Sequence, residues 1–325
     1  MNDILETVLL LALPASGKSE VRRYLKSLPP RTCRDDFHMG PSVQLDDFPY
    51  VHMMRRIDDT LSKLGAERIF FHSSERPFKN AWDWGTLIGL VNEDYADLTA
   101  KKVAKPSSAA RLLFDRMEAA AGKAGIKPRL AALPQRTLQA LAEALEAEAA
   151  GMLKEKQENI PDTLSGKTLV IEFARGGPSG SPLPLPAPLG YRYSLGQLAP
   201  AILEKAAILY VWVTPEQSRR KNEARADPKD PGSILHHGVP IEVMTNDYGV
   251  DDMEWLEENS ERRQAVTVEA RGGKFPLPIA RFDNRVDKTS FLRDDPKLWS
   301  PEKVAAVHEG LRAAMGTLAA QRSKG

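Results

Sequence analysis

The sequence predicts an α/β protein whose core is a doubly wound, parallel β-sheet. The prediction rests on short, uninterrupted apolar runs and on the long, mostly helical segments that separate them. Continuous apolar runs are typical of strands that are buried on both faces, as in a parallel sheet. Repeated βα units cross over in a right-handed sense, so we expect helices on both faces of the sheet. The expected strands are residues 7–13, 42–45, 168–171, 207–213 and 277–282.

The composition excludes several classes of protein. The chain has 325 residues, with 45 Lys and Arg against 44 Asp and Glu, and a single cysteine. A net charge of +1 gives no global attraction for a long nucleic acid or an anionic membrane. Cys33 cannot form an intrachain disulfide, and it lacks the paired spacing of a metal site. No apolar run approaches the ~20 residues that cross a bilayer, and Asp3 and Glu6 stand where a signal peptide carries positive charge. We therefore expect a cytoplasmic protein.

A segment of about a hundred residues separates the second and third expected strands, far more than a loop needs. Leu138, Leu141 and Leu145 keep helical spacing within it, and residues 107–121 are also typical of a helix. We therefore expect a mainly helical insertion at 61–164, between the core segments 1–60 and 165–325. Its apolar stripe suits either packing on its own domain, which we favour, or dimerisation.

The most informative motif lies between the first strand and the helix that follows it. Residues 12–19 match the Walker A pattern G-x-x-x-x-G-K-[ST], except that Ala12 replaces the first glycine. Gly17 lets the backbone approach an anion, Lys18 supplies a charge for the β- and γ-phosphates, and the Ser19 hydroxyl is suited to Mg²⁺. The helix N-terminus adds converging N–H groups. The expected phosphate-binding residues are Pro14, Ala15, Ser16, Gly17, Lys18 and Ser19.

Two points remain open for this motif. A strand–turn–helix with a buried or solvated lysine would look the same in sequence. Ala12 is tolerable if its φ is negative, because alanine is costly only where a glycine-specific conformation is required.

This loop resembles those of the P-loop kinase superfamily, particularly nucleoside-kinase-like, zeta-toxin and polynucleotide-kinase-like phosphotransferases. Their loops often read Leu-Pro-x-Ser-Gly-Lys-Ser, and this chain reads Leu-Pro-Ala-Ser-Gly-Lys-Ser at residues 13–19. The resemblance implies a P-loop NTPase core, ATP and Mg²⁺ as cofactors, and transfer of the γ-phosphoryl group to an alcohol. A nucleoside or nucleotide is the first acceptor that it suggests.

Asp46 and Asp47 follow the second strand, at the carboxyl edge where ligands of open α/β sheets bind. Phosphoryl transfer commonly needs a carboxylate that orients the acceptor hydroxyl and takes its proton. The pair with Phe48 also looks like the Asp-Asp-Phe/Tyr stretch of uridine-kinase-like enzymes, which lies near the acceptor there. A solvated acidic turn is the alternative. We expect Asp46 to be the base.

Glu172 and Arg175 follow the third strand and reach the same edge. Glu172 suits either a water-mediated contact with Mg²⁺, as in a Walker B acid, or the role of base, as the Glu-Arg pair of deoxyribonucleoside kinases implies. Arg175 suits a bidentate contact with a phosphate or with the acceptor. A purely structural Glu–Arg pair explains the two residues equally well.

The helix after the fourth strand is strongly basic and runs into a segment rich in Pro, Asp and Gly. It looks like the lid of a P-loop kinase, in which Arg219 and Arg225 would neutralise charge on the transferred phosphoryl group. A solvated basic helix is the alternative. Residues 282–284 follow the last strand, where adenine-contacting loops often lie in the superfamily.

Together these features predict an ATP- and Mg²⁺-dependent kinase whose partners are ATP and a small hydroxyl-bearing acceptor. Two other hypotheses stay open: a nucleotide-binding switch that engages a protein partner through the insertion, and a phosphotransferase acting on a macromolecular end.

Overall fold

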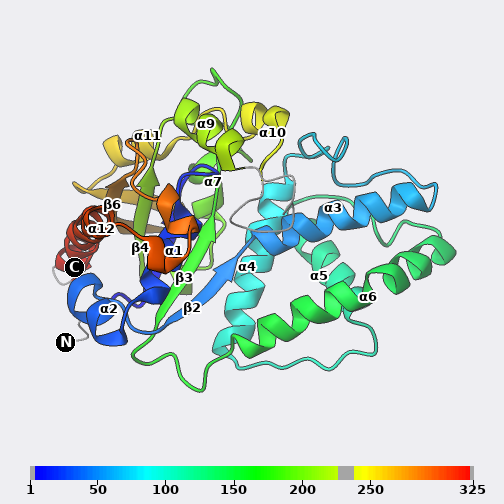
Figure 1. Cartoon of the computed structure of the whole chain (residues 1–325). Helices are drawn as coiled ribbons and strands as arrows, with labels where there is room; N and C mark the ends of the chain where they lie inside the picture. The colour runs from blue at the N-terminus through cyan, green and yellow to red at the C-terminus, as the bar shows by residue number, and fades with distance from the viewer. Residues whose placement is uncertain (1–3, 226–237, 323–325) are drawn as a thin grey trace.

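One six-stranded sheet forms the centre of the protein, in a computed structural model that describes residues 4–225 and 238–322 (Figure 1). The architecture is α/β, as the sequence predicts, and each expected strand is found within a few residues of its expected bounds. The strands are β1 Thr7–Leu11, β2 Ser42–Asp46, β3 Thr168–Phe173, β4 Ala206–Trp212, β5 Ala265–Ala270 and β6 Gly273–Asp283.

The strand order is β2-β3-β1-β4-β6-β5, and all neighbours are parallel except β5 and β6. From β1 the chain moves toward one edge of the sheet, to β2, and from β3 it moves toward the opposite edge, to β4. The sheet is therefore doubly wound. The strand β5 was not among the expected strands. A two-residue turn at Arg271 and Gly272, both with positive φ, joins it to β6 as a hairpin.

The helices fall into groups that follow the chain. Between β1 and β2 lie α1 Lys18–Ser27 and α2 Pro30–Phe37. Between β2 and β3 lie α3 Phe48–Lys63, α4 Asp83–Thr99, α5 Ala109–Lys123 and α6 Gln135–Glu158. Between β3 and β5 lie α7 Gly190–Gly196, α8 Pro200–Leu203, α9 Pro215–Arg225, α10 Ile241–Asn246 and α11 Met253–Glu258. The 3₁₀ turns Ser290–Arg293 and Pro296–Leu298 and the helix α12 Pro301–Arg322 follow β6.

Both faces of the sheet are covered, as predicted. Val8 and Leu10 of β1 pack with α1, α2 and α12 on one face. Leu9 and Leu11 pack with α4, α7 and α11 on the other. All five residues of β1 are buried, which explains why this strand has no polar alternation in the sequence.

The helices α3 to α6 form a layer beside β2, on one side of the sheet (Figure 1). They share a second core that contains Phe71, Phe78 and Trp84 in addition to aliphatic residues of all four helices. Because α3 begins at Phe48, directly after β2, this layer is joined to the carboxyl edge of the sheet. No helix in the described ranges is long and apolar enough to span a membrane.

Candidate functional site

The loop 12–19 connects β1 to α1 and has the backbone that its sequence requires. Gly17 precedes the first residue of α1 with φ +107°, a conformation that favours glycine. A Cβ atom at this position would lie 2.5 Å from Thr289 Oγ1 and 2.7 Å from Asn284 Nδ2. In the described chain, positive φ angles in this loop occur at Ala15 and Gly17 but not at Ala12. The alanine that replaces the first glycine of the motif therefore does not need a glycine-specific conformation.

Lys18 lies inside this loop. It is 8% exposed, and its Nζ donates to the carbonyl oxygens of Ala12 at 3.1 Å and Leu13 at 3.4 Å. The ammonium group is thus held at the mouth of the loop, beside the N-terminus of α1. Both features attract an anion, because the helix dipole and the first amides of a helix favour negative charge.

The helix α9 and the segment after β6 both donate hydrogen bonds to the loop. Ser218 of α9 donates from its Oγ to the Pro14 carbonyl oxygen at 2.7 Å. Asn284, after β6, donates from its Nδ2 to the Ser16 carbonyl oxygen at 2.7 Å, and its own carbonyl oxygen accepts from Lys221 Nζ at 2.9 Å. Asn284 is therefore a support of the loop. Nothing in its local sequence identifies this role, because its partner lies 268 positions away.

Asp46 and Glu172 are register partners at the ends of β2 and β3. Arg22 of α1 bridges them, since its Nη1 lies 3.1 Å from Asp46 Oδ2 and 2.6 Å from Glu172 Oε2. Burial, the charge of Glu172 and the charge of Asp47 raise the pKa of Asp46 to about 7, although Arg22 opposes the shift. A carboxyl with such a pKa exchanges its proton near neutral pH, which suits a general base.

Asp47 pairs with Arg175, whose Nη1 lies 2.6 Å from its Oδ2. Arg175 is 1% exposed; its Nε donates to Ser194 Oγ at 2.9 Å, and its guanidinium lies 4.8 Å from the ring centre of Trp84. Burial raises the pKa of Asp47, and the charges of Arg175 and Lys18 oppose that shift. The predicted Glu–Arg pair is thus divided: Glu172 pairs with Arg22, and Arg175 pairs with Asp47.

One cavity of about 170 Å³ joins the loop to these carboxylates. The predicted site residues among its lining are Pro14, Ala15, Ser16, Gly17, Lys18, Ser19, Asp46, Asp47 and Glu172. Arg175 lies behind the lining, in contact with Asp47. Arg219 does not line the cavity, and its Nη2 lies 3.6 Å from Glu216 Oε1. The side chain of Arg225 falls outside the described residues, as does the Pro-, Asp- and Gly-rich segment after it, so the lid stays a prediction.

The other end of the cavity has aromatic walls, and we call this end the aromatic chamber. It comprises Phe71, Phe78, Trp84 and Tyr248, together with the charged side chains of Arg55 and Asp247. The Phe71 and Phe78 rings stack with centres 4.4 Å apart, and Trp84 meets Phe78 edge-on at 5.1 Å. The chamber was not among the predicted features, because its residues come from four separate stretches of chain.

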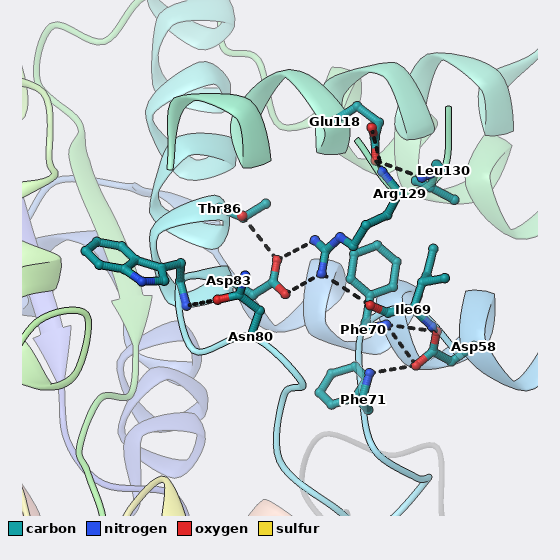
Figure 2. A network of polar contacts seen from close by, with 11 residues as sticks. Asp58, Ile69, Phe70, Phe71, Asn80, Asp83, Thr86, Glu118, Arg129 and Leu130 are labelled. Atoms are coloured by element: carbon teal, nitrogen blue, oxygen red, sulfur yellow. Dashed lines mark hydrogen bonds and ion pairs between the residues drawn. The ribbon is translucent and has the colours of Figure 1, made fainter. Parts of the chain in front are cut away.

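A buried polar network holds the wall that carries Phe71 (Figure 2). The Asp58 carboxylate accepts from the backbone N–H groups of residues 69 to 71, at 2.7 Å for the first and the last. Arg129 donates to both carboxylate oxygens of Asp83 at 2.7 Å and to the Ile69 carbonyl oxygen at 3.3 Å. Asp58 and Asp83 are fully buried. These contacts fix the backbone of the chamber wall at residues 69 to 71.

The metal prediction concerns Ser19 and Glu172, which line the same cavity. Among the described residues there is no group of three or more His, Cys, Asp or Glu side chains arranged to hold a metal ion. Mg²⁺ commonly takes only one or two protein oxygens and completes its shell with water and substrate phosphate. The oxygen donors of Ser19 and Glu172 fit that mode of binding.

Comparisons of the chain with protein-family models, with curated proteins and with solved structures found no match.

Proposed function

We propose that the protein is a P-loop phosphotransferase that moves the γ-phosphoryl group of ATP to a hydroxyl of a small molecule. One observation carries the proposal: loop 12–19, three carboxylates and the aromatic chamber line a single cavity. The loop suits the phosphates and the chamber suits the acceptor. A cytoplasmic location is part of this proposal.

At the phosphate end, Lys18 and the N-terminus of α1 would bind the β- and γ-phosphates. The carbonyl oxygens that now accept from Lys18 Nζ would give way to phosphate oxygens. Ser19, together with Glu172 through water, would hold Mg²⁺, which would neutralise charge on the phosphates. A nucleotide lying here would bring its γ-phosphate toward the carboxylates at the ends of β2 and β3.

At the acceptor end, Asp46 would take the hydroxyl proton, because its pKa of about 7 suits proton exchange at neutral pH. Asp47 would orient the same hydroxyl while Arg175 fixes its carboxylate. The apolar walls would exclude water, which otherwise competes with the acceptor.

The test is to incubate the protein with Mg²⁺-ATP and a pooled panel of nucleosides, sugars and other small alcohols. Phosphorylated products are detected by mass. Lys18→Ala is compared with Lys26→Ala, which removes an exposed lysine from the same helix. We expect a product with wild type and Lys26→Ala and none with Lys18→Ala, which should retain its circular dichroism spectrum.

Full activity in Lys18→Ala would refute the assignment. ATP binding without any product would instead favour a nucleotide-binding switch or a macromolecular acceptor.

A further inference from the structure

The aromatic chamber contains a buried carboxylate for which the described chain provides no hydrogen-bond donor. Asp247 lines the cavity and is 8% exposed; no donor of the described residues reaches its carboxylate oxygens, which are open to the cavity rather than sealed in the core. Two other buried aspartates accept hydrogen bonds from the chain: Asp83 accepts from Arg129, and Asp252 accepts from the backbone of Tyr191. Buried charged groups are normally paired or hydrogen-bonded. Asp247 is thus an acceptor that faces the cavity and lacks its donor.

The backbone around Asp247 is fixed. Its N–H donates to the Val243 carbonyl oxygen at 2.8 Å, at the end of α10. The next residues are tied to the segment after β3, because Gly177 N–H donates to Val250 O at 2.8 Å and Gly249 N–H donates to Gly177 O at 2.9 Å. A Cβ atom at Gly176 would lie 2.9 Å from the Asp247 carbonyl oxygen. The main chain that carries the Asp247 side chain is therefore held in place.

The charge of Arg55 acts on this carboxylate, but the two side chains do not form an ion pair within the described structure. The Arg55 guanidinium lies 4.0 Å from the ring centre of Phe71, and its Nη1 donates to the Ser74 carbonyl oxygen at 2.6 Å. Burial raises the pKa of Asp247 to about 7, and Arg55 only partly opposes this shift. A donor from a ligand would relieve the cost of burial.

The charge of the cavity points to the kind of donor. Its lining has four carboxylates but only two side chains that always carry positive charge. These are Lys18, Asp46, Asp47, Arg55, Glu172 and Asp247. Lys18 belongs to the phosphate end, and Arg22 and Arg175 pair with the three carboxylates there. Among the described residues, the chamber end has one carboxylate, that of Asp247, which forms no ion pair with Arg55. A positive or partly positive N–H group of a ligand complements this carboxylate. The aromatic side chains give the chamber apolar walls, which suit a flat apolar body beside that group.

We propose that Asp247 determines acceptor specificity by accepting a hydrogen bond from an N–H group of the acceptor, which is an alcohol with an aromatic body. The proposal rests on the proposed function and extends it to the substrate class. The hydroxyl would lie at Asp46 and Asp47, the aromatic body within the aromatic chamber, and the N–H group at Asp247.

Two matched pairs of probes test this proposal by isothermal titration without ATP. Adenosine and purine riboside differ by a neutral amino group, and 2-amino-1-phenylethanol and 1-phenylethanol differ by an ammonium group. We expect the amine-bearing member of at least one pair to bind about 10- to 100-fold more tightly. The pair that shows the preference tells whether the N–H group is neutral or charged.

Variants then test whether Asp247 causes the preference for the amine-bearing probe. Asp247→Ala should abolish it, and Asp247→Asn should abolish it for the ammonium because the amide carries no charge. Asp115→Asn, at an exposed aspartate of α5, should leave it unchanged. Equal binding of both members in both pairs would overturn the proposal. So would a preference that persists in Asp247→Ala, once circular dichroism shows that the variant is folded.

The binding assay separates this inference from the proposed function. Lys18→Ala should keep the amine preference, since Lys18 lies at the phosphate end. An amine preference without any phosphoryl transfer would refute only the proposed kinase function. Lys18-dependent transfer to acceptors that bind independently of Asp247 would refute only the present inference.

Discussion

The two ends of the cavity are built differently. The phosphate end is one continuous stretch, residues 12–19, at the junction of a buried strand and a helix. The aromatic chamber is gathered from α3, the loop at 69–78, α4 and the segment after α10. The phosphate end has little freedom to vary, because a turn of that shape needs Gly17. The chamber has many independent parts, so we expect it to set which acceptor is used.

The largest effect should come from the carboxylates that lie between the two ends. Asp46→Asn should lower kcat/KM for the acceptor about 10²- to 10⁴-fold, because it removes the group that takes the proton. In wild type, kcat/KM should rise with pH through about 7, as Asp46 loses its proton, and the variant should lack this rise. Asp35→Asn, at an exposed aspartate of α2, should behave as wild type. An unchanged pH profile in Asp46→Asn would assign the base elsewhere.

The chamber should depend on its buried polar network. Arg129→Met leaves the fully buried Asp83 without its ion-pair partner and should lower the free energy of unfolding by about 3–5 kcal/mol. Urea denaturation measures this change. Arg136→Met, at an exposed position of α6, serves as the control. A loss for Arg129→Met no larger than that of the control would show that the network does not hold the chamber wall.

The phosphate end should depend on a single glycine. Gly17→Ala combines a φ of +107° with a Cβ 2.5 Å from Thr289 Oγ1, and we expect it to cost about 1–3 kcal/mol in stability. It should also weaken ATP binding. Gly151→Ala, in α6 with open space around it, should be neutral or slightly stabilising. Equal stability of the two variants would contradict the strain argument.

Both ends contribute to the pH dependence of stability. The pKa is raised to about 7 for Asp46 and Asp247 and to about 6 for Asp251, whereas an unfolded aspartate titrates near 3.9. The folded state therefore binds more protons between about pH 4 and 7, and stability falls as the pH rises through this window. Each such carboxyl contributes about 1.4 kcal/mol per pH unit between pH 5 and its folded pKa, so Asp247 alone should account for a loss of roughly 2–3 kcal/mol from pH 5 to pH 8. Asp247→Asn should flatten the curve, and a wild-type stability that rises over this range would contradict the assigned shifts.

The smallest effect should be specific to the acceptor. Phe71→Leu keeps an apolar side chain but removes the stacked pair with Phe78, so it should raise the acceptor KM by about 3- to 10-fold. The KM for ATP should not change. Phe291→Leu, on the α12 side of the sheet, is the matched control. A change in both KM values would mean that the two ends are not separate.

Much of the phosphate end was predictable because its signals are local. The apolar run of β1, Gly17 and Lys18 are adjacent in sequence, and carboxyl ends of parallel strands bring Asp46 and Glu172 together. The structure confirms the α/β class and the expected strands.

The chamber was not predictable in the same way. Asp247 follows a six-residue helix, and no spacing relates it to Phe71 or Trp84. Arg22 had a local signal, because it lies one turn after Lys18 on α1 and so faces the same edge of the sheet. The hairpin turn at Arg271 and Gly272 likewise could have located β5. The positions of the other chamber residues depend on tertiary packing, which has no local signal in the sequence.

The most direct test of the central claim is the affinity of loop 12–19 for a nucleoside triphosphate. Titration calorimetry should compare Mg²⁺-ATP binding by wild type, Lys18→Ala and Lys26→Ala. We predict saturable binding by wild type and Lys26→Ala, and an affinity at least about 10-fold weaker for Lys18→Ala, which loses a charged hydrogen bond to phosphate. Equal affinity of all three proteins, or no binding by wild type, would contradict the assignment of this loop.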